Sequence, residues 1–173
     1  MRCRDFEKIS EKQFHINSYS PKYNSLATTH DIIVEAYNTI QIPRRATKKS
    51  SGYDFISPFS FILCPRDSIK INTGIKAYML FFEELLLFPR SSVGINYKIK
   101  IDNTIGKIDS DYYNNSDNEG DIVISLTNTG DICWHVKAGD KIAQGSFYQY
   151  LTTDTDNPVK EERSGGIGST NER

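Results

Sequence analysis

The sequence predicts one domain of the all-β class, built from short strands with frequent turns. Residues 68–79 (SIKINTGIKAYM) and 98–102 (KIKID) alternate apolar and polar side chains, as half-buried strands do. Glycine or proline recurs at short intervals between Pro43 and Gly139, which indicates many chain reversals. This combination is typical of a β-sandwich, barrel or jelly roll.

The N-terminal part is the exception to this pattern. Residues 4–16 predict a short amphipathic helix, because Phe6, Ile9 and Phe14 fall partly on one side. Residues 17–31 are polar and predict a loop, and strand signals dominate from residue 37 onward. We therefore separate a short N-terminal extension, residues 1–36, from a β domain of residues 37–151.

Within the β domain, the most apolar run is residues 77–88 (AYMLFFEELLLF), which we interpret as two buried strands joined at Glu83 and Glu84. Residues 121–128 (DIVISLTN) and 141–151 (KIAQGSFYQYL) predict two further strands. Residues 114–121 (NNSDNEGD) predict an exposed acidic loop. Residues 152–173 have few apolar side chains to pack, so we expect a flexible C-terminal arm.

Composition excludes several classes of function. The 21 basic and 22 acidic side chains give a net charge of −1, which argues against direct nucleic-acid binding but not against a small anionic ligand. Cys3, Cys64 and Cys133 are scattered, so neither a disulfide framework nor a zinc site is indicated and inert thiols are expected. The N-terminus lacks a signal-like apolar core, and the run 77–88 falls short of the ~20 residues of a membrane span. We expect a cytoplasmic protein without a membrane partner.

Two segments offer groups suited to phosphate. Residues 162–173 (ERSGGIGSTNER) combine Arg163 with Gly165, Gly166 and Gly168, whose backbone N–H groups can form an anion-binding nest. Residues 88–94 (FPRSSVG) place a guanidinium beside two hydroxyls. The structural alternatives are a charged tail for the first segment and a serine helix cap with a solvated arginine for the second.

Three more segments have both a functional and a structural interpretation. Residues 138–145 (AGDKIAQG) include Gln144, whose amide can donate to phosphate, but they also suit an ordinary hairpin turn. Residues 50–55 (SSGYDF) include Asp54, which can hold a metal-bound water or serve in a structural turn. Residues 103–115 (NTIGKIDSDYYNN) include Asp109 as a candidate general base, or form a surface hairpin with a polar tip.

The order and spacing of these segments carry more information than any one of them. SGYD, PRSS, NTIGKIDSDYY, GDKIAQ and RSGGIGST resemble, in this order, the five motifs of the trimeric dUTPase family, over residues 41–171. The form of the third and fifth motifs is most similar to a firmicute or phage branch. The resemblance implies a distorted jelly-roll subunit of the β-clip type and a homotrimer with active sites shared between subunits. It also implies Mg²⁺-dependent hydrolysis of dUTP to dUMP and pyrophosphate, which limits uracil in DNA.

The resemblance also implies a role for individual residues. Asp109 would orient and deprotonate the water that attacks the α-phosphorus, Tyr112 would pack on the deoxyribose, and Asn103, Gly106 and Ile108 would read the uracil. The C-terminal arm would close over a neighbour's site, with Ile167 covering the base where many members have phenylalanine. Magnesium would have no direct protein ligand, with Asp54 acting at most through water. The triphosphate would be held by Arg90, Ser91, Ser92, Gln144, Arg163, Gly166, Gly168 and Ser169.

Two other functions stay open at this point. A dCTP deaminase shares the fold, but it needs a glutamate base in the strand where this chain has Ser125. Phage members of the dUTPase family can also capture a repressor protein, so a repressor is a possible partner if the chain is phage-borne. The loop after Tyr112 is longer than in many members, and the sequence assigns no role to it or to the N-terminal extension.

Overall fold

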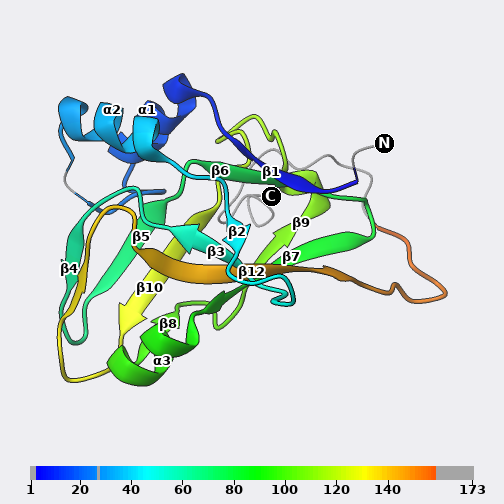
Figure 1. Cartoon of the computed structure of the whole chain (residues 1–173). Coiled ribbons are helices and arrows are strands. Elements are labelled where there is room, and N and C mark those ends of the chain that lie inside the picture. The colour runs from blue at the N-terminus through cyan, green and yellow to red at the C-terminus, as the bar shows by residue number, and fades with distance from the viewer. Residues whose placement is uncertain (1–2, 27, 159–173) are drawn as a thin grey trace.

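The computed structural model describes residues 3–26 and 28–158, and most of its regular structure is β (Figure 1). The helices are α1 (Glu11–Tyr19), α2 (His30–Thr39), α3 (Ser91–Tyr97) and the 3-10 turn η1 (Ser110–Tyr112). The strands are β1 (Asp5–Lys8), β2 (Arg44–Arg45), β3 (Tyr53–Ile56), β4 (Phe61–Leu63), β5 (Ser68–Asn72), β6 (Ile75–Tyr78), β7 (Glu83–Pro89), β8 (Ile99–Ile101), β9 (Gly106–Asp109), β10 (Val123–Asn128), β11 (Trp134–Val136) and β12 (Lys141–Gln149). The all-β prediction is confirmed.

The largest sheet has the strand order β2-β3-β12-β7-β9. A three-stranded sheet has the order β5-β10-β8, and the pairs β1-β6 and β4-β11 complete the fold. Every strand pair is antiparallel. The longest pairing joins β12 to β7, from Ala143 opposite Pro89 to Gln149 opposite Glu83. This pair forms the centre of the large sheet in Figure 1.

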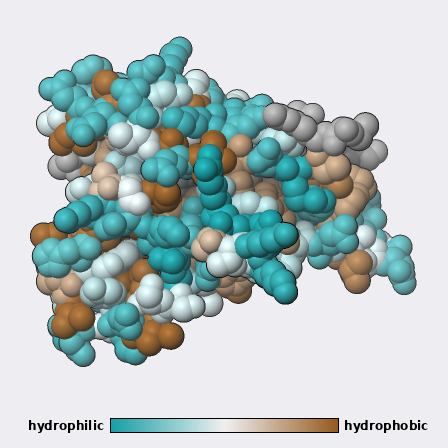
Figure 2. Space-filling model, in the orientation of Figure 1, coloured by the Kyte–Doolittle hydropathy of each residue, from teal (hydrophilic) through white to brown (hydrophobic). Residues whose placement is uncertain are grey.

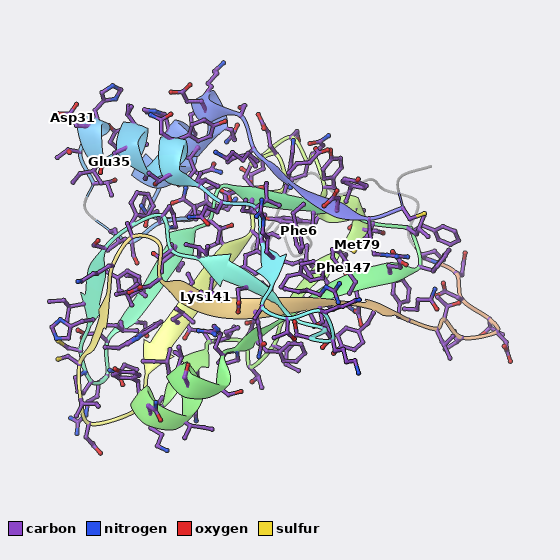
Figure 3. The ribbon with its side chains drawn as sticks, in the orientation of Figure 1. Phe6, Asp31, Glu35, Met79, Lys141 and Phe147 are labelled. Atoms are coloured by element: carbon purple, nitrogen blue, oxygen red, sulfur yellow. The ribbon has the colours of Figure 1, made fainter. Side chains whose placement is uncertain are left out.

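The core lies between these sheets and is filled by the predicted alternation. Ile122, Ile124 and Leu126 are buried, and the last two project from the same face of β10, as the sequence pattern predicted. An aromatic group closes the other side of the core, where the Phe6 ring lies 5.3 Å from Tyr53 and 5.2 Å from Phe147 (Figure 3). Phe6 therefore joins the N-terminal segment to the same core as the β domain.

The prediction of one helix over residues 4–16 is wrong. Residues 5–8 form β1, which pairs with β6, and the helix begins only after Ser10, whose hydroxyl accepts a hydrogen bond from the Gln13 N–H. The reason is that Phe6 packs across the sheet, which an extended backbone allows.

The prediction of a loop up to residue 31, with strands from residue 37, also missed a helix. Residues 30–39 form α2, which buries Ile33 and Ala36. Tertiary packing of this apolar face stabilises a short helix that weak local propensity alone does not indicate. Within the residues that the structure describes, no helix is both long and apolar enough to cross a bilayer.

The junction within residues 77–88 differs slightly from the expectation. The chain turns at residues 79–82, and both glutamates lie inside β7 rather than between two strands. Glu83 is buried because Arg4 Nε donates to its carboxylate at 2.9 Å and the Leu80 N–H donates to it at 3.1 Å. Hydrogen bonds from Arg4 hold the pKa of Glu83 below its usual range.

The expectation of an exposed acidic loop at residues 114–121 is only partly right: Asn114, Ser116 and Asp117 are exposed, but the rest of the loop is not. Asn115, Asn118 and Asp121 are buried, and each has hydrogen-bond partners inside the protein. Asp121 accepts from Asn17 Nδ2 and from the Gly74 N–H, both at 2.8 Å. The buried polar side chains of the loop bond to one another and to the backbone instead of to water.

Asp121 should make the stability of the protein depend on pH. Burial raises its pKa from 3.8 to about 7, since desolvation disfavours the charged form more than Asn17 and Gly74 stabilise it. The folded state then binds the proton more tightly, so this stabilisation is complete below pH 3.8 and is lost as pH rises through about 7. Denaturant unfolding of wild type and Asp121→Asn across this range should show wild type losing a few kcal/mol relative to the variant. A difference between the two proteins that stays constant with pH would contradict the assignment.

Candidate active site

Three of the five predicted segments converge at one end of the large sheet. Gln144 in β12 lies opposite Asp54 in β3 and opposite Phe88 in β7. Arg90 directly follows β7, at the same end of the sheet. The antiparallel register therefore brings together side chains from residues 50–55, 88–94 and 138–145.

Asp54 is the centre of this group. Its side chain is 8% exposed, and it forms ion pairs with Arg90 Nε at 3.0 Å and with Lys141 Nζ at 2.6 Å. We call Asp54, Arg90, Lys141 and Gln144 the Asp54 cluster. Sequence reasoning assigned no role to Lys141, although it stands at the start of the strand that carries Gln144. Figure 3 labels it at this end of β12.

Gln144 is held in place by the neighbouring backbone. Its Nε2 donates to the Pro89 carbonyl at 3.3 Å. Gly52 leaves room for the amide, because a Cβ at that position would lie only 2.7 Å from Gln144 Oε1. Ser91 and Ser92 are exposed in the first turn of α3, next to Arg90. The cluster thus presents cations, an amide and hydroxyls at one edge of the fold.

The segment with the candidate base, residues 103–112, is not a simple hairpin. The preceding strand β8 pairs with β10, whereas β9 pairs with β7, so the chain passes from one sheet to the other. Asn103 is exposed in the connecting turn, Gly106 is buried and Ile108 is half-buried. Gly106 permits the close approach of β9 to β7, since an added Cβ would lie 3.0 Å from Leu87 Cβ.

Asp109 lies at the end of β9, opposite Glu84 of β7. The two carboxylates would repel each other, but Lys107 lies beside both, with Nζ 3.0 Å from Glu84 Oε2 and 3.9 Å from Asp109 Oδ1. The hydrogen bond with Glu84 raises the pKa of Lys107, which keeps this cation charged. The Asp109 side chain is 41% exposed and is therefore accessible to water.

The Tyr112 ring is buried and its hydroxyl is hydrogen-bonded inside the protein. It is 7% exposed, and its hydroxyl donates to the Asp121 carbonyl at 2.9 Å. Asn118 Nδ2 in turn donates to the Tyr112 hydroxyl at 2.7 Å. The phenol ring is therefore held in place, and its polar group is already occupied.

The Asp54 cluster and Asp109 are well separated within one chain. Asp109 pairs with Glu84, and Arg90 follows six residues later along the same strand direction. At the usual rise of a strand, this places their backbones about 20 Å apart. One protomer therefore does not bring the candidate base next to the candidate phosphate ligands.

The remaining predicted residues cannot be placed. Arg163, Gly166, Ile167, Gly168 and Ser169 lie outside the described residues, as does most of the predicted C-terminal arm. Among the residues described, no group of three or more His, Cys, Asp or Glu side chains could hold a metal ion. The part of the chain in view thus supplies no cage for magnesium.

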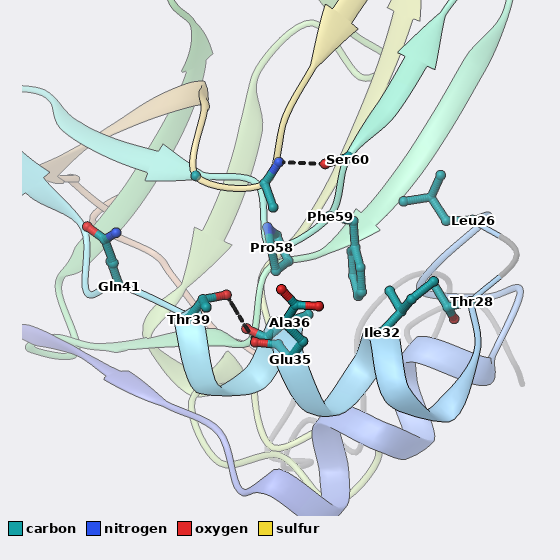
Figure 4. A pocket seen from close by; sticks show the side chains of 12 residues that line it. Leu26, Thr28, Ile32, Glu35, Ala36, Thr39, Gln41, Pro58, Phe59 and Ser60 are labelled. Atoms are coloured by element: carbon teal, nitrogen blue, oxygen red, sulfur yellow. Dashed lines mark hydrogen bonds between the residues drawn. The ribbon is translucent and has the colours of Figure 1, made fainter.

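A pocket of about 590 Å³ lies elsewhere, between α2 and the turns that follow β3 and β11 (Figure 4). Ile32, Glu35 and Ala36 of α2 line one side, and Pro58 and Phe59 line the other. None of the candidate residues placed above contributes to it.

The chain is similar to known proteins in both sequence and fold. The family profile described as dUTPase matches residues 38–171. The deoxyuridine 5'-triphosphate nucleotidohydrolase of Lactococcus lactis is 41% identical over 132 residues, which cover 76% of this chain and 88% of that protein.

The chain belongs to the dUTPase family. The crystal structure of the dUTPase from Streptococcus mutans aligns with a TM-score of 0.63 at 30% identity, covering 87% of this chain and 98% of that one. The dUTPase of phage phi11 of S. aureus shares the fold, with a TM-score of 0.56 at 24% identity over 70% of this chain and 90% of that one. These neighbours confirm the jelly-roll class, and the firmicute relatives agree with the predicted branch.

Proposed function

We propose that the protein hydrolyses dUTP to dUMP and pyrophosphate in active sites shared between the subunits of a homotrimer. Family membership supports the reaction. The separation of about 20 Å between Arg90 and Asp109 supports the sharing, because a second protomer can bring its Asp54 cluster to the first protomer's Asp109. The deaminase alternative gains no support, since Ser125 is hydrogen-bonded to Asp102 and offers no carboxylate base.

Asp109 is the proposed catalytic base. Its partial exposure lets a water reach the carboxylate. Lys107 offsets the negative charge of the neighbouring Glu84 by pairing with it. The carboxylate orients the water and accepts its proton as the oxygen attacks the α-phosphorus. The leaving group is pyrophosphate, so the charge that accumulates on its oxygens needs stabilisation from cations.

The Asp54 cluster is the proposed source of those cations. The Arg90 guanidinium and the Gln144 amide can both donate to phosphate oxygens, and the hydroxyls of Ser91 and Ser92 lie beside them. The pair with Asp54 restricts the orientation of Arg90, so less conformational entropy is lost when substrate binds. We propose the same phosphate-binding role for Arg163, Gly166, Gly168 and Ser169.

The segment before Asp109 is the proposed recognition site for the base and sugar. Asn103 and the backbone near Gly106 and Ile108 can offer hydrogen bonds to the edge of uracil, and Ile167 can cover the ring. The Tyr112 ring, whose hydroxyl is held by Asn118 and the Asp121 carbonyl, would pack on the deoxyribose and disfavour a 2′-hydroxyl.

Magnesium fits this arrangement as an ion that arrives with the triphosphate. The described residues offer no protein cage, and Mg²⁺ usually keeps several waters and is bound through phosphates. Bound there, it would neutralise phosphate charge. Asp54 is already paired with Arg90 and Lys141, so its contribution to the metal is limited to accepting from a metal-bound water.

The surface next to Asp109 supports assembly with a second copy. Phe81 is 79% exposed and Leu151 is 98% exposed, and the Phe81 carbonyl accepts a hydrogen bond from the Tyr150 hydroxyl. Hydrophobic atoms also gather on this side in Figure 2, where Figure 1 shows β7 and the chain after β12. Exposed apolar side chains of this kind mark interaction surfaces. A cytoplasmic location and binding of a repressor stay predictions from the sequence alone.

Replacing Asp109 should abolish turnover without abolishing binding. Asp109→Asn keeps the shape of the side chain but removes the proton acceptor, so kcat for dUTP should fall about 10²- to 10⁴-fold. Pyrophosphate release measures the rate, and calorimetry with a non-hydrolysable dUTP analogue measures affinity. The matched control is Asp111→Asn, which changes the same charge two residues away. A wild-type rate in the Asp109 variant would refute the assignment of the base.

Shared sites predict that two inactive variants restore activity when mixed. Arg90→Ala should fold, because Asp54 keeps its partner Lys141, but it should lose phosphate binding. After co-expression with Asp109→Asn, about a quarter of sites should have both intact groups, since each of the two contributing protomers is the right one half of the time. Activity of all trimers purified after co-expression, homotrimers included, tests this. Mixed trimers as inactive as either parent would place both residues in the same protomer.

A further inference from the structure

The N-terminal segment and the loop after Tyr112 are joined by several hydrogen bonds and an ion pair. We call residues 10–23 and 113–121 together the brace. The Ser10 N–H and hydroxyl both donate to Glu119, at 2.8 and 2.6 Å, and Asn17 Nδ2 donates to Asp121 at 2.8 Å. Lys22 forms an ion pair with Asp117 at 2.7 Å. These contacts join parts of the chain that are about 100 residues apart.

The loop part of the brace holds Tyr112 at two points. Asn118 Nδ2 and the Asp121 carbonyl bond to the phenol hydroxyl, as described above. Asn115 Nδ2 donates to the Tyr112 backbone carbonyl at 2.8 Å and to Asn118 Oδ1 at 2.9 Å. The three loop side chains are buried, so these bonds are shielded from competition with water.

We infer that the brace positions the Tyr112 ring and thereby sets the preference of the enzyme for deoxyribose over ribose. This inference rests on the proposed function, in which the ring faces the sugar. A ring packed against the sugar excludes the additional 2′-hydroxyl of a ribonucleotide only if the ring cannot move by a fraction of an ångström. Asn118 and Asp121 fix the ring directly, and Asn17 acts through Asp121. All three are positioning residues.

The test is the ratio of kcat/KM for UTP to that for dUTP. Asn118→Ala removes the donor to the hydroxyl, so the ratio should rise about tenfold, because the loss of a buried hydrogen bond corresponds to roughly that factor. Tyr112→Phe should shift the ratio in the same direction while keeping the ring, and it covers the case that Asn118→Ala does not fold. Asn17→Ala should give a smaller rise. Lys12→Ala, on the exposed side of α1, is the matched control and should leave the ratio unchanged.

The outcomes distinguish a failure of the positioning role of the brace from a failure of the proposed function. A merely structural loss lowers both kcat/KM values by the same factor, so an unchanged ratio in Asn118→Ala and Tyr112→Phe overturns the inference. If the ratio rises in Asn118→Ala and Tyr112→Phe but not in Asn17→Ala, the N-terminal segment does not contribute to the preference. Wild-type protein that does not hydrolyse dUTP at all would refute the proposed function itself, and this inference with it.

An independent observation concerns Cys64 and Cys133. Their sulfur atoms are 2.8 Å apart, although 69 residues separate them in the sequence. Cys64 directly follows Leu63, and Cys133 directly precedes Trp134. Leu63 and Trp134 lie opposite each other in the antiparallel pair β4-β11. Asn128 Nδ2 donates to the carbonyls of Leu63 and Ile132, both at 2.9 Å, and so fixes the two strand ends.

We propose that these two thiols are a site of reversible oxidation to an intramolecular disulfide. Residues opposite each other in antiparallel strands have Cα atoms roughly 4.5–5.5 Å apart, within the range of disulfides. Hydrogen peroxide oxidises one thiolate to a sulfenic acid and is reduced to water or hydroxide. The second thiol then attacks that sulfur, which forms the S–S bond and releases water. Cys133 raises the pKa of Cys64, so the reaction should be faster in mildly alkaline buffer.

Peptide mapping without reductant tests this proposal. Peroxide-treated protein should yield a linked pair of peptides containing Cys64 and Cys133, and free thiols should fall from three to one. Dithiothreitol should restore all three. Cys64→Ser and Cys133→Ser should each abolish the linked pair, whereas Cys3→Ser should leave it. Oxidation of all three cysteines to sulfinic acids without a linked peptide would overturn the proposal.

Discussion

The antiparallel pairing of β7 with β12 on one side and β9 on the other determines where every described functional group lies. The register with β12 puts Gln144 beside Asp54 and Arg90, and the register with β9 puts Asp109 beside Glu84. A slip of one residue would move each of these side chains to the opposite face. The Asp54 cluster lies at one end of β7, and Asp109 with Glu84 lies at the other. The pairing of β7 with its two neighbours therefore assembles each group and also keeps the two groups apart.

Sequence reasoning identified the family more accurately than it identified the local structure. The five motifs indicated the family, which the comparisons confirm, and the strands predicted over residues 121–128 and 141–151 formed as β10 (Val123–Asn128) and β12 (Lys141–Gln149). Lys141 was missed because its ion pair with Asp54 joins two strands that are far apart in the sequence. The adjacency of Cys64 and Cys133 was missed for the same reason, since pairing between distant strands leaves no mark in the local pattern.

The errors are concentrated in the N-terminal segment and in the loop of residues 114–121, and both arise from contacts between distant parts of the chain. In the N-terminal segment, Phe6 packs across the sheet and so favours a strand over the predicted helix. In the loop, polarity was taken as a sign of exposure, whereas its buried polar groups bond inside the protein, as in the bonds of Asn17 with Asp121 and of Asn115 with Asn118. A buried polar network has no periodicity to detect, and its stability depends on partners about 100 residues away.

The distance between Asp109 and the Asp54 cluster has a consequence for the life of the protein. On the proposed arrangement, a newly made chain carries only incomplete sites, and it becomes an enzyme when other copies join it. Specific activity is then governed by mass action, so dilution lowers it even when every chain remains folded. The abundance of the chain would itself act as a control on the hydrolysis of its nucleotide.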